Sequence, residues 1–176
     1  PGFRVNIKGV GKFMLKADQA AEGEKATGAT AIASRLYHAA GWWSVCDTVV
    51  YVPRRLLTLK PGLMSADNSG VSKPFDQAKL DSVLGAAQKR GDNYRMLASL
   101  WLEGRTIGPF KYEETREDDP NDLIPHERRR DLRGQAPLMA WLANTDLKED
   151  NTLDAWQADP ANPAIHRATT AQEIWA

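Results

Sequence analysis

The N-terminal residues change from the alternation of a strand to the spacing of a helix. Apolar and polar side chains alternate over residues 3–7, and Gly9-Val10-Gly11 supplies a tight turn into a second such segment, which carries Lys16. From about residue 24 to residue 40, apolar side chains recur at i, i+3 and i+4, and Gly41 follows as a stop signal. The pattern predicts a β-hairpin followed by a helix.

The middle of the chain is predicted to contain two strands, separated by a loop and a short helix. Residues 48–52 form a β-branched run that ends at Pro53, which is strand composition. Residues 60–73 are rich in Pro, Gly, Ser, Asp and Asn and are expected to form a surface loop. A short helix is expected over residues 76–90. Another strand is expected over residues 94–102, although its apolar spacing also suits a helix.

The second half is predicted to be mainly helical. Residues 113–122 are strongly charged and too polar for the core. A helix that starts at Pro125 is expected to end at Gly134, and an apolar helix then leads to Trp141, whose side chain we expect to be buried. Pro137 fits the first turn of that second helix, or a kink in one longer helix.

The order of elements predicts an α+β fold, with an antiparallel N-terminal sheet and a helical C-terminal part; residues after Leu153 show little pattern. At 176 residues and 42% hydrophobic content, the chain is long enough for one continuous domain with a core. Its formal net charge is zero, and no apolar run reaches transmembrane length. We therefore expect neither nucleic acid nor a membrane as a partner.

Two features leave the cellular location open. Cys46 is the single cysteine, which excludes an internal disulfide, and it lies beside a strand-like run, which favours a buried, unreactive thiol. The chain begins at Pro1 and opens directly into a strand pattern, so we expect a fragment of a longer protein, with the cytoplasm as the default location. No pattern indicates an oligomeric state.

The candidate chemistry lies at the end of the second apolar helix. Asp146 follows this helix and precedes Asn151 by five residues. In kinase-like phosphotransferases, an Asp at this spacing orients and deprotonates the attacking hydroxyl, and the Asn holds a magnesium ion on the nucleotide phosphates. The spacing alone is weak evidence, because Asp and Asn also concentrate in turns, where Asp146 would only shape the loop.

Around this loop the sequence resembles HipA-type serine/threonine kinases and, more loosely, phosphatidylinositol 3/4-kinase-like proteins. It resembles more closely a group of uncharacterised bacterial kinase-like proteins, over about residues 11–154. Five signatures carry the resemblance, among them Gly-Arg-x-x-Gly-Pro-Phe, Arg-x-Asp-Asp-Pro-Asn-Asp and His-Glu-x-Arg-Arg-x-Leu-Arg-Gly. They lie at residues 104–110, 116–122, 126–134, 140–142 and 148–154.

The resemblance implies a protein-kinase-like (HipA-like) fold, present as a partial domain. Residues 1–102 would form an N-lobe-like sheet with its helix, and residues 103–176 a hinge and a truncated, helical C-lobe-like part. The implied activity is that of an ATP-dependent phosphotransferase that uses ATP and magnesium. Its partner is a nucleotide, and the phosphate acceptor stays unknown.

Carried over to this chain, the resemblance assigns the site residues. Lys16 matches the strand lysine that contacts the α/β-phosphates, and Glu24, or failing it Glu22, matches its partner at the start of a helix. Asp146 matches the catalytic aspartate, and Asn151 matches the metal-binding asparagine. Adenine would lie along a hinge at residues 102–105, which includes Leu102, Glu103 and Gly104.

Two parts of the kinase pattern are missing. No phosphate-covering strand and loop precede Phe3, unless Gly9-Val10-Gly11 does this work. A second magnesium-binding Asp is expected near residues 166–170, which read His-Arg-Ala-Thr-Thr. Three hypotheses stay open: a phosphotransferase, a non-catalytic nucleotide-binding or protein-interaction module on the same scaffold, and an accidental match. In the last, Lys16 is a snorkelling surface lysine.

Overall fold

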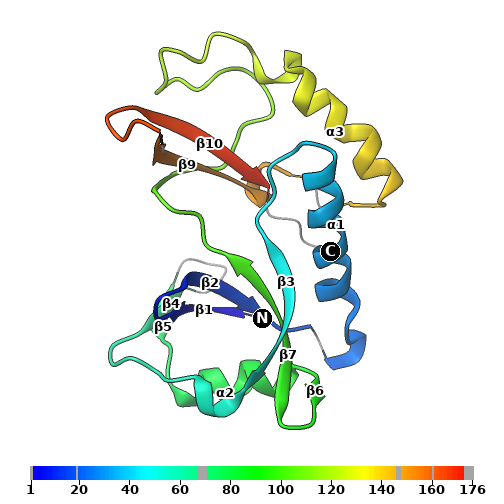
Figure 1. Ribbon diagram of the computed structural model, residues 1–176, viewed down its shortest axis with the longest axis vertical. Helices are drawn as coiled ribbons and strands as arrows, with labels where there is room; N and C mark the ends of the chain where they lie inside the picture. Colours follow the sequence, from blue (N-terminus) through cyan, green and yellow to red (C-terminus); the bar gives the residue numbers. More distant parts are fainter. Residues whose placement is uncertain (1, 19, 67–70, 146–147, 160, 173–176) are drawn as a thin grey trace. The chain divides into compact units, whose positions relative to one another are not determined.

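The computed structural model describes residues 2–18, 20–66, 71–145, 148–159 and 161–172 (Figure 1). The chain divides into two compact units. The first comprises Pro1–Ala31 and Asp47–Leu100, and the second comprises Ile32–Cys46 and Trp101–Ala176. The chain leaves the first unit for the last time after Leu100, and the second unit also includes residues 32–46. The division of one continuous domain at residues 102 and 103 stays a prediction.

The first unit is built on an antiparallel sheet with the strand order β1-β2-β7-β3 (Figure 1). The predicted N-terminal hairpin is confirmed, and so are the two predicted strands in the middle of the chain. The hairpin was indicated by alternation, and the strand before Pro53 by its β-branched composition. The strands are β1 (Gly2–Ile7), β2 (Gly11–Lys16), β3 (Asp47–Pro53) and β7 (Asn93–Leu100), and β6 (Lys89–Arg90) pairs with the start of β7.

One face of this sheet carries the hydrophobic core of the first unit, packed against α2 (Gln77–Ala86). α2 begins after Asp76, whose carboxylate accepts the amide hydrogen of Lys79 at 2.9 Å. It ends before the predicted residue 90, because Lys89–Arg90 pairs with β7 instead. The buried residues of the core are Phe3, Leu15, Ala17, Leu80, Val83, Leu84, Ala87 and Met96.

The remaining elements of the first unit are short. The predicted surface loop over residues 60–73 contains a small antiparallel hairpin of β4 (Met64–Ala66) and β5 (Ser72–Pro74). Two 3-10 turns, η1 (Ala20–Glu22) and η2 (Arg54–Leu56), connect larger elements. The predicted helix over residues 24–40 is confirmed as α1 (Lys25–Ala39), which starts in the first unit and ends in the second.

The second unit contains a three-stranded antiparallel sheet in the order β10-β9-β8. Its strands are β8 (Arg105–Gly108), β9 (Thr152–Ala158) and β10 (His166–Gln172). The expectation of a helical C-terminal part, with little pattern after Leu153, is therefore wrong for these residues. The reason lies at Asp154, a buried polar residue inside β9 that hides the usual alternation.

The helical segment of the second unit consists of η3 (His126–Arg128) and α3 (Arg130–Trp141). Gly134 was expected to end a helix, but it lies inside α3, as does Pro137. A side chain at Gly134 would meet the indole of Trp42, since a Cβ there would lie 3.2 Å from Trp42 Cζ2. Glycine at this position therefore allows close packing rather than ending the helix.

Two residues that we expected to be buried are exposed. Trp141 is 73% exposed, and Cys46 is exposed directly before β3. The apolar face of α3 is formed by Met139, Leu138 and Leu142, which pack against the end of α1. At 100° per residue, that face leaves position 141 outside it.

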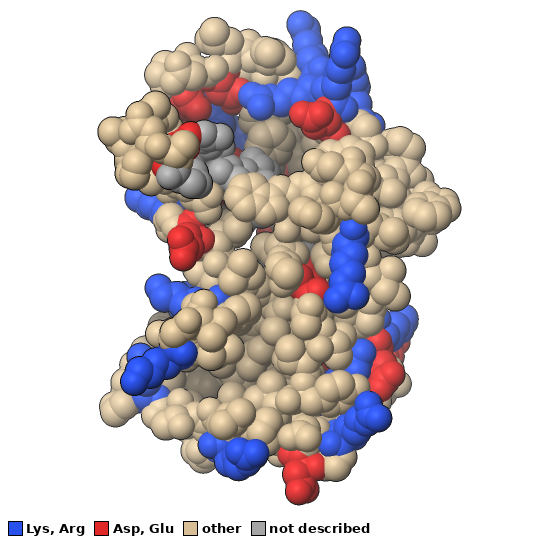
Figure 2. Space-filling model, viewed as in Figure 1, with Lys and Arg blue, Asp and Glu red and all other residues tan. Residues whose placement is uncertain are grey.

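The architecture is thus α+β, as predicted, with antiparallel sheets accompanied by α-helices. Basic and acidic side chains are scattered over both units on the face drawn in Figure 2, in line with the zero formal net charge. Within the described ranges, every helix is too short or too polar to cross a bilayer.

Candidate functional site

The sheet of the first unit has a second, polar face that carries Lys16. In the antiparallel register, Lys16 lies opposite Leu97, and Arg95 lies opposite Tyr51. Residues directly opposite one another share a face, and so do alternate residues of one strand. All four therefore lie on the face away from α2. Lys16 is only 8% exposed, which does not fit a snorkelling surface lysine.

A buried ion pair lies on this polar face. Arg95 Nη1 donates a hydrogen bond to Asp18 Oδ2 at 2.9 Å, and both side chains are buried. Thr27 joins the pair, because its hydroxyl donates to Asp18 Oδ2 at 2.6 Å and accepts a hydrogen bond from Arg95 Nη1. A buried charge is tolerated only when it is paired and hydrogen-bonded in this way. The three residues form one unit, named here the Asp18–Thr27–Arg95 cluster.

This cluster fixes the start of α1 to the sheet. The backbone amide of Thr27, in the first turn of α1, donates to Asp18 Oδ1 at 2.8 Å. The first amides of a helix lack partners within the helix, and the positive end of its dipole favours a carboxylate. Asp18 therefore caps α1 from outside the helix while it neutralises Arg95.

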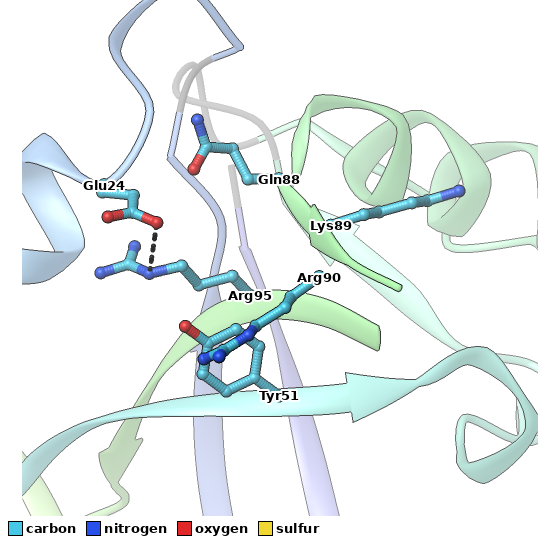
Figure 3. Close-up of a pocket in the computed structure, with 6 residues that line it drawn as sticks. All are labelled: Glu24, Tyr51, Gln88, Lys89, Arg90 and Arg95. Atoms are coloured by element: carbon cyan, nitrogen blue, oxygen red, sulfur yellow. Dashed lines mark ion pairs between the residues drawn. The ribbon is translucent and has the colours of Figure 1, made fainter. Parts of the chain in front are cut away.

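Glu24 lies against Arg95, at the position directly before α1. Its Oε1 is 3.7 Å from Arg95 Nε, and its side chain is 64% exposed. The two residues line a pocket of about 230 Å³ together with the segment 88–90 and Tyr51 (Figure 3). Glu24 was predicted to be the helix partner of Lys16. That role stays a prediction, while the ion pair with Arg95 is one that the sequence did not indicate.

The predicted hinge follows β7, where the chain passes from the first unit to the second. Leu102 and Glu103 lie outside the strands, and the carbonyl of Glu103 accepts a hydrogen bond from Gln157 Nε2 at 2.7 Å. Gly104 has a φ of 97°, and a Cβ there would lie 2.4 Å from the carbonyl oxygen of Trp156. Only glycine fits both the left-handed backbone and this close approach.

The catalytic-type loop of the sequence lies in the second unit. Asp146 falls outside the described residues, so its role stays a prediction. Before it, the backbone amide of Asn144 donates to the carbonyl of Met139 at 3.0 Å, and its side chain lies near Tyr37, a fully buried residue of α1. Burial raises the pKa of Tyr37, and the neighbouring Asn144 side chain lowers it in part. The entrance to the loop is therefore tied to the interior of the second unit.

The exit of the loop is tied to the segment 110–112. Asn151 is buried at the end of η4 (Glu149–Asn151). The amide of Tyr112 donates to Glu149 Oε1 at 2.7 Å, and the amide of Phe110 donates to the hydroxyl of Thr152 at 2.7 Å. Burial, followed by the charges of Glu149 and Tyr37, raises the pKa of Tyr112 to about 12. These contacts hold the backbone around Asn151.

A polar cluster joins two of the sequence signatures in the second unit. The ring of His126 faces two acceptors, the carbonyl of Lys111 from Nδ1 at 2.5 Å and the carboxylate of Asp122 from Nε2 at 2.6 Å. A proton must therefore lie between Nε2 and Asp122. Phe110 stacks on the ring with centroids 4.2 Å apart. Contrary to the expectation that residues 113–122 are too polar for the core, Asp122 is buried.

The charges around Asp122 explain how its carboxylate is accommodated. Burial raises the pKa of Asp122, but the amide of Arg116, the ring of His126 and the charge of Arg129 act in the opposite direction, so that its pKa is lowered overall. Arg129 also forms an ion pair with Asp122. Figure 2 shows basic side chains gathered over the start of α3, next to acidic ones. These contacts hold the loop before α3, and they occupy the carboxylate of Asp122.

Arg116 extends the same network to the sheet of the second unit. Its Nη1 donates to Asp154 Oδ2 at 2.9 Å, its Nη2 donates to the carbonyl of Ile107, and its amide donates to Asp122. Within the signature Arg-x-Asp-Asp-Pro-Asn-Asp, Arg116, Asp118 and Asp122 are thus engaged in internal ion pairs and hydrogen bonds. A charged pair between a loop arginine and a strand aspartate has no signal in local sequence.

The described ranges contain no group of three or more His, Cys, Asp or Glu side chains placed to hold a metal ion. The buried side chain of Asn151 carries an amide oxygen, a type of ligand that magnesium accepts, and magnesium needs only one or two protein ligands when phosphates supply the others. The residues present are therefore compatible with the predicted metal role of Asn151.

No protein-family model, curated protein or solved structure matches the chain.

Proposed function

We propose that the chain belongs to an ATP-dependent phosphotransferase of the kinase-like type. One observation carries the proposal: the strand that bears Lys16 is hydrogen-bonded to β7, the strand that runs into the predicted hinge. A lysine that reaches the phosphates and a hinge that holds the base must act on one nucleotide, so their strands should be neighbours. If the resemblance to kinases were accidental, nothing would require β2 and β7 to be neighbouring strands.

The element that follows Lys16 also supports the proposal. In protein kinases, the strand lysine is assisted by a glutamate of a helix that follows it. Here β2 leads into α1, and carboxylates stand at residues 18, 22 and 24 on the way. The buried Asp18 anchors the start of that helix to the sheet. Such an anchor holds the helix at a defined position beside the lysine.

In the proposed reaction, Lys16 neutralises charge on the α/β-phosphates. Asp146 accepts the proton of the acceptor hydroxyl, whose oxygen forms a bond to the γ-phosphorus as the bond to the ADP oxygen breaks. Magnesium, when bound, neutralises the charge that develops on the phosphate oxygens, and Asn151 is its proposed ligand. The catalytic gain comes from positioning and from charge neutralisation.

A second candidate function is nucleotide binding without transfer. It is favoured by β10, His166–Gln172, which contains no carboxylate although a second magnesium-binding Asp was expected there. With one metal ligand fewer, a nucleotide could still bind, but the γ-phosphate would be held less firmly for transfer.

Binding of Mg-ATP is expected to raise the melting temperature, because the ligand binds only the folded chain. At a hundredfold excess over Kd, the added stability is about 2.7 kcal/mol, or roughly 5–10 °C for a chain of this length. Lys16→Met should abolish the shift while its apolar stem still fills the buried position. Differential scanning fluorimetry measures both. Lys12→Met, an exposed lysine of the same strand, is the matched control and should keep the full shift. An equal shift in wild type and Lys16→Met would remove Lys16 from the nucleotide site.

Any magnesium-dependent transfer from labelled ATP is expected to be slow in this chain and to disappear in Asp146→Asn. The Mg-ATP melting shift should persist in that variant, since the aspartate acts on the acceptor hydroxyl and not on the nucleotide. Asp150→Asn, an exposed neighbour in the same loop, is the control and should leave turnover unchanged. Turnover that survives Asp146→Asn would contradict the catalytic assignment, and absence of transfer with intact binding would favour the second candidate.

A further inference from the structure

The pocket in the first unit is lined by residues that the proposed nucleotide site does not use, apart from Glu24. It is formed where the start of α1, β3, β6 and β7 meet (Figure 3). Lys16 pairs with Leu97 of β7, and Arg95 lies two residues earlier on that strand. Arg95 is therefore further than Leu97 from the end of β7 that leads into the predicted hinge. The lining residues are Glu24, Tyr51, Gln88, Lys89, Arg90 and Arg95.

Arg95 presents an unsatisfied donor to this pocket. Its side chain is only 9% exposed, and its Nη1 is engaged by Asp18 and Thr27. Among the residues that the structure describes, its Nε has no hydrogen-bond acceptor, because Glu24 Oε1 is 3.7 Å away, beyond hydrogen-bonding distance. This N–H is held only by the loose ion pair with Glu24, so an oxyanion placed here would gain a charge-assisted hydrogen bond.

Arg90 supplies a second cation on the same side. Its guanidinium lies over the ring of Tyr51, with 5.8 Å from Cζ to the ring centroid, and Tyr51 lies opposite Arg95 in the sheet. The neighbouring Lys89 points to the other face, where its Nζ lies 4.7 Å from the centroid of the Tyr94 ring (Figure 3). The guanidinium groups of both arginines therefore face the pocket, whereas the ammonium group of Lys89, a residue that also lines it, points away.

Glu24 is suited to leave the pocket when an anion enters. Its exposed side chain makes only the loose pair with Arg95. The carboxylate marks where an oxyanion can lie, and the amide of Gln88 stands at the rim as a further donor (Figure 3).

We propose that this pocket is a binding site for a phosphate dianion. Arg95 and Arg90 hold the phosphate oxygens, and Glu24 turns out to solvent. Asp18 already pairs with Nη1 of Arg95, and with Glu24 turned out the two guanidinium groups leave one positive charge in excess. Guanidinium groups match phosphate geometry better than ammonium groups. The phosphate can be free or can belong to a phosphorylated side chain. The inference goes beyond the proposed phosphotransferase activity and does not depend on it.

The test is a calorimetric titration of the 176-residue chain with inorganic phosphate, at ionic strength held constant with chloride. Saturable binding is expected, and Arg90→Gln should weaken it by about tenfold or more, the usual worth of a charged hydrogen bond. Lys89→Gln, the adjacent position on the same strand, should change the affinity by less than about twofold. Glu24→Gln should tighten binding, because the competing carboxylate is gone.

A parallel titration with a short phosphoserine peptide separates the two sources. Tighter binding of the peptide than of inorganic phosphate assigns the pocket to a phosphorylated side chain, and equal affinities assign it to the free anion. Equal weakening by Lys89→Gln and Arg90→Gln, or absence of saturable binding in Glu24→Gln, would overturn the proposal. Phosphate affinity lost in Lys16→Met would also overturn it, because the anion would then occupy the nucleotide site. Circular dichroism checks that each variant is folded.

Discussion

Asp18→Ala is expected to lower the free energy of unfolding by about 3–5 kcal/mol, as the loss of one partner of a buried ion pair does. The substitution leaves the guanidinium of Arg95 buried without its main carboxylate, and it removes the acceptor of two hydrogen bonds from Thr27. Urea denaturation measures the change. Hydrogen exchange should also show faster exchange of the Thr27 amide, because the start of α1 loses its cap.

Two further variants isolate the role of burial in that effect. Asp81→Ala removes an exposed carboxylate that lies 3.7 Å from Arg54, and its effect should stay below about 1 kcal/mol. The double variant of Asp18→Ala with Arg95→Met should cost less than the sum of its single variants, because no unpaired charge is left behind. Additive effects would mean that the two side chains do not act as a pair.

Tyr37→Ala is expected to lower the free energy of unfolding by about 3–5 kcal/mol, as truncations of large aromatic residues in cores do. Tyr37 is 0% exposed and packs with Met139 and Trp42 in the core of the second unit. Trp141→Ala, in the same unit, is expected to cost less than about 1 kcal/mol, because that side chain is 73% exposed. Urea denaturation of both variants measures the contrast.

The two aromatic variants test the orientation of α3. A large effect of Trp141→Ala together with a small effect of Tyr37→Ala would mean that α3 buries a different face from the one described here. Tyr37→Phe separates packing from polarity, since it removes only a buried hydroxyl that has no hydrogen-bond partner among the described residues, and its cost should stay below about 0.5 kcal/mol.

The sequence by itself determined the elements whose pattern is local. The N-terminal hairpin and α1 each show one clear period, because each has one apolar face and one polar face over its length. β3 was indicated by β-branched composition, and the spacing of β7 also suited a helix. The turn and stop signals were local as well, as at Gly41, which has a φ of 98° after the end of α1. The kinase-type site residues came from motif spacing and resemblance, and Asp146 remains outside the described residues.

Only the tertiary structure decided which charges are buried. Asp18 and Arg95 are 77 residues apart and form a buried contact, and Arg116 and Asp154 are 38 apart and form a partly buried one. A local pattern classes such residues as surface positions, which is why β9 and the burial of Asp122 were not predicted and Lys16 seemed equally suited to the surface. The physical reason is that a charge can be buried only where a partner compensates the lost hydration. Such partners come from paired strands and from loops distant in the sequence, and the hydrophobic pattern of a short segment does not show which distant residues will lie next to it.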